Sequence, residues 1–158
     1  MYLEMIVSGI ALDPFTNSPI VILKNQSGEK ILPIWVGYME ASSIAMELEK
    51  TPRSRPITHD LLKNILDSVN FSLTKIEVTE LKDNTFYAVI YLSNNDKEIA
   101  LDSRPSDAIA IAIRTGAPIY VNEKVIENAQ KIEIDEKKEK LNEVLEDIPD
   151  EDFGKYKM

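Results

Sequence analysis

The sequence predicts an α+β fold in which mostly antiparallel strands form two β-rich halves, each followed by short buried helices. Runs of alternating or β-branched residues, bounded by turn residues, recur in both halves of the chain. Each set of runs is followed by a segment with helical spacing or helix-boundary residues. A charged helix at the C-terminal end completes the expected architecture.

The first half reads as three strands followed by a helix. Alternation or apolar runs predict the strands, and a loop rich in Pro, Asn and Ser separates the first two. The helix follows from apolar residues repeated at a spacing of about four. The expected strands are residues 2–12, 20–24 and 30–36, and the expected helix is residues 39–48.

The second half begins after a basic loop bounded by prolines, residues 50–56. Thr58 is expected to cap an amphipathic helix over 58–69, whose apolar side chains form a clear stripe. Tight turns then separate β-type runs, which predict a second antiparallel set. The expected strands are residues 71–81, 85–92 and 97–102.

Residues 108–113 alternate Ala and Ile, which fits either a strand or a helix that is apolar all round. Pro105 before the segment and Gly116 after it favour the helix, because each suits a helix boundary. Such a helix must be buried on more than one side. Asp107 would lie in its first turn, where a carboxylate meets the positive end of the helix dipole.

The composition is that of a soluble globular domain, with 44% hydrophobic and 28% charged residues. No apolar run approaches the ~20 residues of a membrane helix, and no export leader is evident, so no membrane partner is expected. The absence of cysteine excludes disulfides and thiolate metal sites and fits a cytoplasmic location. A net charge of −9 weighs against a protein that coats nucleic acid, but not against local binding of a phosphodiester.

Four segments, taken in order, resemble the bifunctional nuclease domain family, which was formerly catalogued as a bacterial domain of unknown function. The resemblance covers roughly residues 1–130 and implies a compact, oligomeric α+β domain with the activity on RNA and DNA reported for plant members. Residues 131–158 lie outside it and are expected to form an acidic helical extension. The four segments are Leu32-Pro-Ile-Trp-Val-Gly, Arg55-Pro-Ile-Thr-His-Asp-Leu-Leu, Asn84-Thr-Phe-Tyr-Ala and Asp102-Ser-Arg-Pro-Ser-Asp-Ala-Ile-Ala.

His59 is the only histidine of the chain and therefore the only side chain with an unperturbed pKa near neutrality. With Asp60 beside it, it is a candidate general base or metal ligand. A structural interpretation stays open, in which Thr58 caps the helix, Asp60 meets its dipole and His59 only packs.

The polar turn ahead of the Ala/Ile segment is the second candidate site. Asp102 and Asp107 are expected to converge on Mg²⁺ or Mn²⁺, which would activate a water and neutralise charge on a phosphate. Glu40 and Glu47 are possible further ligands, although a solvated helix face is the favoured explanation for both. The alternative for the turn is an internal bridge between Arg104 and Asp107, with Ser106 as the cap.

Arginine side chains are the expected phosphate ligands, because guanidinium groups bind phosphate oxygens in pairs. The candidates are Arg53 and Arg55 from the basic loop, and Arg104 from the polar turn. Trp35 lies in an apolar strand and is expected in the core or in a subunit contact rather than under a nucleic-acid base.

Two functions follow as hypotheses. The first is a metal-assisted nuclease acting on RNA or single-stranded DNA, with catalytic roles for the side chains of four residues. The second is a non-catalytic regulatory or scaffold module whose polar clusters hold an oligomer together and whose tail binds a protein partner. Either would be a homo-oligomer, with a dimer as the expected form. The four catalytic candidates are His59, Asp60, Ser106 and Asp107.

Overall fold

A computed structural model describes the backbone of residues 1–147 and the side chains of residues 1–136. Within this part of the chain the strands form one seven-stranded sheet, in the order β3-β2-β1-β7-β4-β5-β6. The strands are β1 (Tyr2–Leu12), β2 (Pro19–Asn25), β3 (Ile31–Trp35), β4 (Ser72–Lys82), β5 (Thr85–Ser93), β6 (Glu98–Ser103) and β7 (Ile119–Asn122). The helices are α1 (Tyr38–Leu48), α2 (Thr58–Ser68), α3 (Pro105–Thr115) and α4 (Glu123–Asp147).

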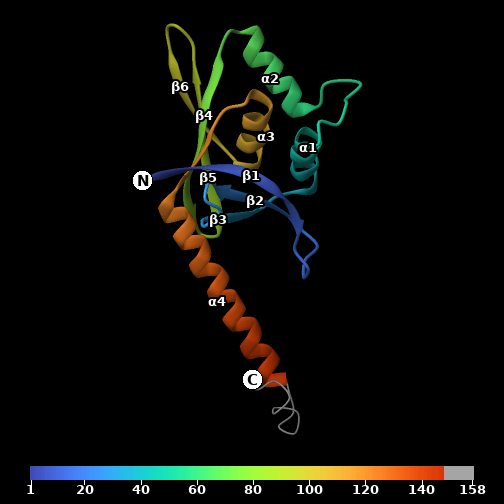
Figure 1. The fold of residues 1–158 in the computed structure, drawn as a ribbon, viewed down its shortest axis with the longest axis vertical. Helices are drawn as coiled ribbons and strands as arrows, with labels where there is room; N and C mark the ends of the chain where they lie inside the picture. Colours follow the sequence, from blue (N-terminus) through green and yellow to red (C-terminus); the bar gives the residue numbers. More distant parts are fainter. Residues whose placement is uncertain (148–158) are drawn as a thin grey trace.

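The two β-rich halves predicted from the sequence are joined in a single sheet. Strands β1, β2 and β3 form one antiparallel meander followed by α1, and β4, β5 and β6 form another followed by α3. Strand β7 lies between the two meanders, antiparallel to β1 and parallel to β4. The mostly antiparallel α+β class is therefore confirmed, and β7 provides its parallel pair (Figure 1).

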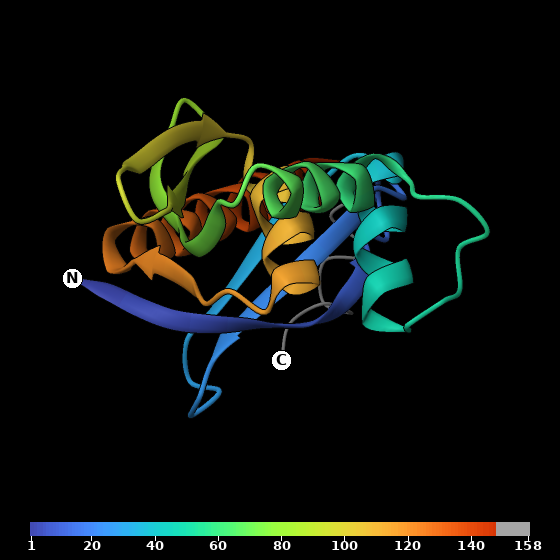
Figure 2. The same cartoon turned by 90° about the horizontal axis from the view of Figure 1, so that it is seen from above.

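The Ala/Ile segment is a helix and not a strand. Pro105 is its first residue, and Gly116 ends it in the left-handed conformation at φ 74°, a backbone angle that favours glycine. Its small Ala108, Ala110 and Ala112 are fully buried, which lets the flanking helices approach closely. Helix α3 packs against α1, α2, β4 and β5, as its apolar surface requires (Figure 2).

The sequence favours a short helix from Asn122 to Ala129 and a separate charged helix over residues 135–145, and helix α4 differs from this expectation. It is one continuous helix, because no Gly or Pro interrupts residues 123–147. Its first turn is anchored by Val125 and Ile126, which are buried in the core. The helix passes through the expected boundary at residue 130 and extends away from the sheet (Figure 1). The last residues of the predicted extension, 148–158, lie outside the described part.

The amphipathic stripe of α2 faces the solvent, although such a stripe usually faces the core. Of the five stripe residues, Leu61, Leu62, Ile65 and Val69 are between 38% and 54% exposed. Only Leu66 packs against the core, and His59 is buried. Helix α2 thus turns its charged side inward. In the part of the chain that the structure describes, no helix is long and apolar enough to cross a membrane.

Candidate active site

A continuous set of hydrogen bonds and ion pairs, here called the polar network, connects α1, α2, α3 and the loop before α2. It joins side chains that are far apart in the sequence and lie where the three helices meet. Most of the predicted site residues belong to it. Its members are Glu40, Ser43, Glu47, Arg53, His59, Asp60, Arg104, Asp107 and Arg114.

Helical spacing explains how the polar network is assembled. Glu40, Ser43 and Glu47 are separated by three and four residues, so they share one face of α1. Asp107 and Arg114 are seven residues apart, which places them on one face of α3, two turns from each other. These two faces point toward each other because α1 packs on α3.

His59 is at the centre of the network and is only 7% exposed. Its Nδ1 atom lies 2.6 Å from the Ser43 hydroxyl, and its Nε2 atom lies 3.0 Å from Oδ1 of Asp107. Both ring nitrogens therefore have a partner, and the imidazole is fixed in orientation. The second residue of α2 thereby contacts both α1 and α3.

The neighbouring groups determine which nitrogen of a neutral His59 carries the proton. Arg114, which can only donate, gives a hydrogen bond to the Ser43 hydroxyl oxygen at 3.0 Å. Nε2 faces the Asp107 carboxylate, which accepts, so Nε2–H donates to it. Nδ1 of the neutral ring is then an acceptor, and the Ser43 hydroxyl donates to it. All the hydrogen bonds thus run in one direction, from Arg114 to Asp107.

The Arg104 end of the network is open to solvent. The Arg104 guanidinium donates to Asp107 Oδ2 and to Glu40 Oε1, both at 2.9 Å, while its side chain stays 65% exposed. The hydrogen bond and charge of Asp107, and then the bond to Glu40, raise the pKa of Arg104 above its ordinary value. The bridge between Arg104 and Asp107, the alternative considered from the sequence, is therefore present.

The Asp60 end is more enclosed. The Asp60 carboxylate accepts hydrogen bonds from Arg53, Arg114 and the backbone N–H of Ile57. The bond from Arg53 is the main reason why the pKa of Asp60 lies far below its usual range, and the bonds from Arg114 and Ile57 add to it against the opposing effect of burial. This carboxylate is also what holds the start of α2. The expectation that Thr58 caps α2 is therefore wrong, since Ile57 is the N-cap residue.

Arg53 extends the network to the last turn of α1. Its guanidinium binds Glu47 as well as Asp60. Burial by itself would raise the pKa of Glu47, but hydrogen bonds from Arg53 and Lys50 outweigh it and lower that pKa. Next to these residues is an open hollow of about 350 Å³. It is lined by Glu47, Thr51, Pro52, Arg53, Asp60, Lys63, Asn64 and Arg114.

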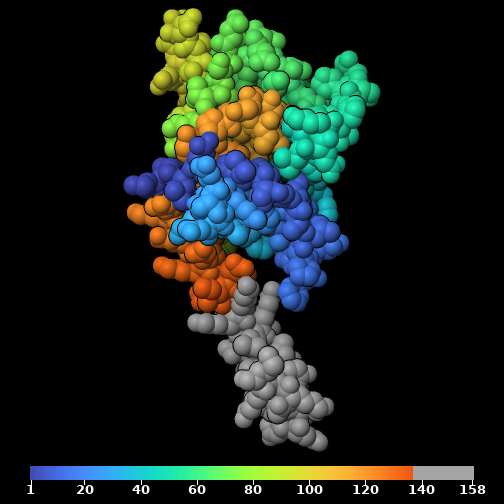
Figure 3. Space-filling model, in the orientation of Figure 1, coloured from blue at the N-terminus to red at the C-terminus, as the bar shows by residue number. Residues whose placement is uncertain are grey.

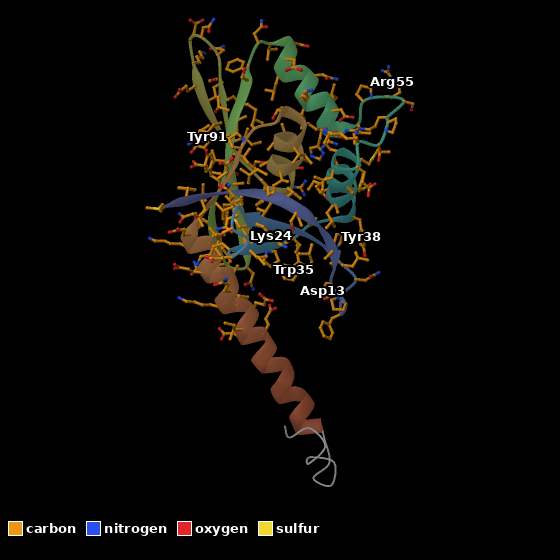
Figure 4. All side chains as sticks on the ribbon, in the orientation of Figure 1. Asp13, Lys24, Trp35, Tyr38, Arg55 and Tyr91 are labelled. Atoms are coloured by element: carbon orange, nitrogen blue, oxygen red, sulfur yellow. The ribbon has the colours of Figure 1, made fainter. Side chains whose placement is uncertain are left out.

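Three predicted residues are not members of the network. Ser106 is buried in the first turn of α3, but the N-cap position belongs to Arg104, so the alternative of a Ser106 cap is wrong. Asp102 is exposed on β6, and within residues 1–136 no hydrogen bond or ion pair joins its side chain to a member of the network. Arg55 is exposed on the loop between α1 and α2 (Figure 4).

Two network residues were not found from the sequence. Ser43 is one of two adjacent serines, and only its helical spacing from Glu40 and Glu47 distinguishes it from Ser42. Arg114 is an arginine at the end of an apolar helix, and its side chain is only 2% exposed. The sequence signal that could have identified Arg114 as a site residue is its position two turns after Asp107, on the same face of α3.

The carboxylates of the site are the side chains that could bind a metal ion. Among the described residues, no group of three or more His, Asp or Glu side chains is arranged to hold one. Glu40 and Asp107 nevertheless approach one another, because both bind the Arg104 guanidinium. One or two carboxylates, completed by water and a substrate phosphate, are what Mg²⁺ commonly uses. In the structure both carboxylates bind the Arg104 guanidinium, so an ion between them would have to replace this cation.

The sequence was compared with protein families and curated proteins. The bifunctional nuclease domain model matches residues 21–134. An uncharacterized protein of Mycobacterium tuberculosis is 35% identical over 153 residues, which cover 97% of this chain and 92% of that protein. Bifunctional nuclease 1 of Oryza sativa subsp. japonica is 32% identical over 114 residues, 68% of this chain and 34% of its own. Bifunctional nuclease 1 of Arabidopsis thaliana is 30% identical over 115 residues, 70% of this chain and 35% of its own. The chain belongs to the bifunctional nuclease domain family.

Proposed function

We propose that this protein is a nuclease that hydrolyses phosphodiester bonds at the open end of the polar network. One arrangement carries the proposal: Asp107 binds His59 through one carboxylate oxygen and the exposed Arg104 through the other. A proton-accepting pair thus lies beside a guanidinium that solvent reaches. Membership of the bifunctional nuclease domain family supports the same reaction.

Each of the three residues has a chemical role in this proposal. A water that attacks phosphorus must lose a proton as its new P–O bond forms and the bond to the leaving oxygen breaks. Asp107 is the partly exposed member of the pair and accepts this proton. His59 stabilises and orients the Asp107 carboxylate through Nε2–H. Arg104 exchanges its contact with Glu40 for a phosphate oxygen, since a guanidinium binds phosphate in a bidentate way.

Mg²⁺ or Mn²⁺ is proposed as the cofactor, with Glu40 and Asp107 as its protein ligands. The ion would supply charge neutralisation on the phosphate and a lower pKa for the bound water. Asp102 is exposed and separate from this pair, so it is the weakest of the three predicted ligands. Ser106, buried behind Asp107, supports α3 rather than the reaction.

RNA or single-stranded DNA is proposed as the substrate. The hollow beside Asp60 is lined by the cations Arg53 and Lys63, and Arg55 is exposed on the same loop as Arg53. A flexible single strand that reaches the site can pass along this basic edge, because phosphate contacts supply most of the affinity for nucleic acid. The chain contains no cysteine, which fits the reducing cytoplasm as the proposed location.

The test is hydrolysis of labelled RNA and labelled single-stranded DNA by purified protein, with EDTA, Mg²⁺ or Mn²⁺. His59→Ala and Asp107→Asn are expected to lower the rate about 100-fold or more. Ser42→Ala is the matched control, because Ser42 is exposed on α1 beside Ser43 and outside the network. Equal rates for all variants would assign the activity to a contaminant. No hydrolysis with any metal would favour the non-catalytic scaffold.

The exposed apolar face of α2 supports a homo-oligomer, with a dimer as the proposed form. Leu61, Ile65 and Val69 follow one another at intervals of four residues, and such a ridge packs against a second helix. Light scattering at micromolar concentration measures the mass of the assembly. Ile65→Asp should convert a dimer into monomers, whereas a monomeric wild-type protein would contradict this proposal.

A further inference from the structure

A second hollow lies away from the polar network, between α4 and the β3 side of the sheet. Its volume is about 650 Å³, within the range of small-molecule sites. It shares no lining residue with the hollow beside Asp60. The lining residues are Asp13, Thr16, Ser18, Pro33, Trp35, Leu81, Asn84, Phe86, Ala129, Ile132, Glu133 and Glu136.

Trp35 forms an aromatic wall of this hollow. Its indole N–H donates to Oδ2 of Asp13 at 3.0 Å, which holds the ring against the loop between β1 and β2 (Figure 4). The residue is 47% exposed, so of the two expected positions, the core and a subunit contact, the core is excluded. Phe86 and Pro33 add further apolar surface to the same hollow. A large aromatic ring is thus held in place and left accessible.

The charged side chains that line the hollow in the described residues are all acidic: Asp13, Glu133 and Glu136. The Asp13 carboxylate accepts hydrogen bonds from the backbone N–H of Phe15 and from the Trp35 indole. These bonds, that of Phe15 first, lower the pKa of Asp13, so this group is ionised at neutral pH. The hollow therefore attracts a cation and repels an anion such as a nucleotide.

We propose that this hollow binds a small organic cation with an apolar body, such as an arylalkylammonium ion. Asp13 and Glu136 provide the negative charge for the ammonium group, and Trp35 and Phe86 provide the surface for the apolar part. An aromatic face also attracts a cation directly, which favours an ammonium ligand over a neutral one. The inference goes beyond the nuclease proposal and does not depend on it.

The space-filling view shows that this binding would occur on a different part of the molecule from α2. Helix α2 lies at one end and α4 at the other (Figure 3). The cation site and the nuclease site can therefore be tested separately. A ligand in one leaves the residues of the other uncovered.

The protein contains its own reporter, because Trp35 is its only tryptophan. The experiment titrates the full chain with phenethylammonium and follows tryptophan emission, with isothermal calorimetry as a second measurement. The neutral 2-phenylethanol and the anionic 3-phenylpropanoate are the matched ligands. The expected result is saturable binding of the amine, at least about tenfold tighter than binding of either analogue.

Two variants test the charges directly. Asp13→Asn keeps an acceptor for the Trp35 indole but removes the negative charge. Glu136→Gln removes the negative charge at an exposed position of α4. Each variant should weaken binding of the amine about tenfold. Glu127 is exposed on α4 and lies outside the hollow, so Glu127→Gln should leave this binding unchanged. Equal binding of amine and alcohol, unchanged binding by both variants, or no saturable signal in either measurement would overturn the proposal.

Discussion

The Nε2 atom of His59 lies 3.0 Å from Oδ1 of Asp107, although the two residues are 48 positions apart in the chain. This contact joins the second residue of α2 to the first turn of α3. Its existence depends on α2 turning its charged side inward, toward α1 and α3. The proposed chemistry and the exposed apolar face of α2 therefore have one structural cause.

The first prediction concerns the proton on His59. In a neutral ring it is expected on Nε2, because Nε2 faces the accepting Asp107 carboxylate and Nδ1 can accept from the Ser43 hydroxyl. The single histidine allows a direct check, since long-range ¹H–¹⁵N spectra show one imidazole only. Ser43→Ala should shift the tautomer balance and Ser42→Ala should not. A dominant Nδ1–H form in the wild type would contradict the proposed direction of the network.

The second prediction contrasts the two arginines that bind the ends of the network. Arg104 is largely exposed, so Arg104→Ala should change the free energy of unfolding by less than about 1 kcal/mol. The same variant should lower nuclease activity strongly. Arg114 is almost fully buried and holds both Ser43 and Asp60, so Arg114→Gln should cost about 3 kcal/mol.

Urea unfolding monitored by circular dichroism, together with the hydrolysis assay, separates these two effects. An Arg104→Ala protein that is as active as the wild type would remove Arg104 from the proposed phosphate site. A stable Arg114→Gln protein would show that the buried arginine is dispensable for packing.

The third prediction uses the pH dependence of stability. The folded-state pKa of Asp60 lies below its unfolded value of about 3.9, so its ion pairs stabilise the protein above that pH. Their contribution is lost as the pH falls from about 4 toward the folded-state pKa. Asp60→Asn should therefore cost about 3 kcal/mol at pH 7 and progressively less below pH 4.

Urea unfolding at pH 7, 5, 4 and 3 measures this difference between wild type and variant. Asp67→Asn is the control, because Asp67 is exposed on the same helix and should change stability by less than about 0.5 kcal/mol at each pH. A loss for Asp60→Asn that stays constant over the whole range would contradict the linkage.

The fourth prediction separates two aspartates that the sequence places in one turn. Asp107 contacts His59 and Arg104, whereas Asp102 is exposed on β6 and outside the network. Asp107→Asn should abolish hydrolysis and Asp102→Asn should retain it, measured over a range of Mg²⁺ concentrations. A raised Mg²⁺ requirement in Asp102→Asn would restore Asp102 as a metal ligand.

Much of the fold was predictable because the residues that mark the ends of its helices and strands lie within or next to those elements. Pro105 and Gly116 bound α3, and alternation or turn residues bound the strands within one or two positions. The orientation of α2 was not predictable. Its pattern shows which side chains share a face, but the direction of that face depends on ion pairs with Arg53 and Arg114, which come from other elements.

The candidate site was partly predictable, because some of its residues are near one another in the sequence. Arg104 and Asp107 are three residues apart, and His59 and Asp60 are adjacent, so their clustering is visible in the sequence. Ser43 and Arg114 meet across 71 positions, and only the packing of α1 on α3 brings them together. Helical spacing places each residue on a face of its own helix, but no local pattern shows that the two residues meet.

The position of β7 has a consequence for synthesis on the ribosome. Residues 2–5 pair with 119–122, so β1 and β4 keep unpaired edges until β7 has emerged. Unpaired strand edges readily associate with other chains. A product that stops before residue 119 would thus be an aggregation-prone fragment rather than a smaller folded domain. Folding of the whole sheet must wait until translation has passed that point.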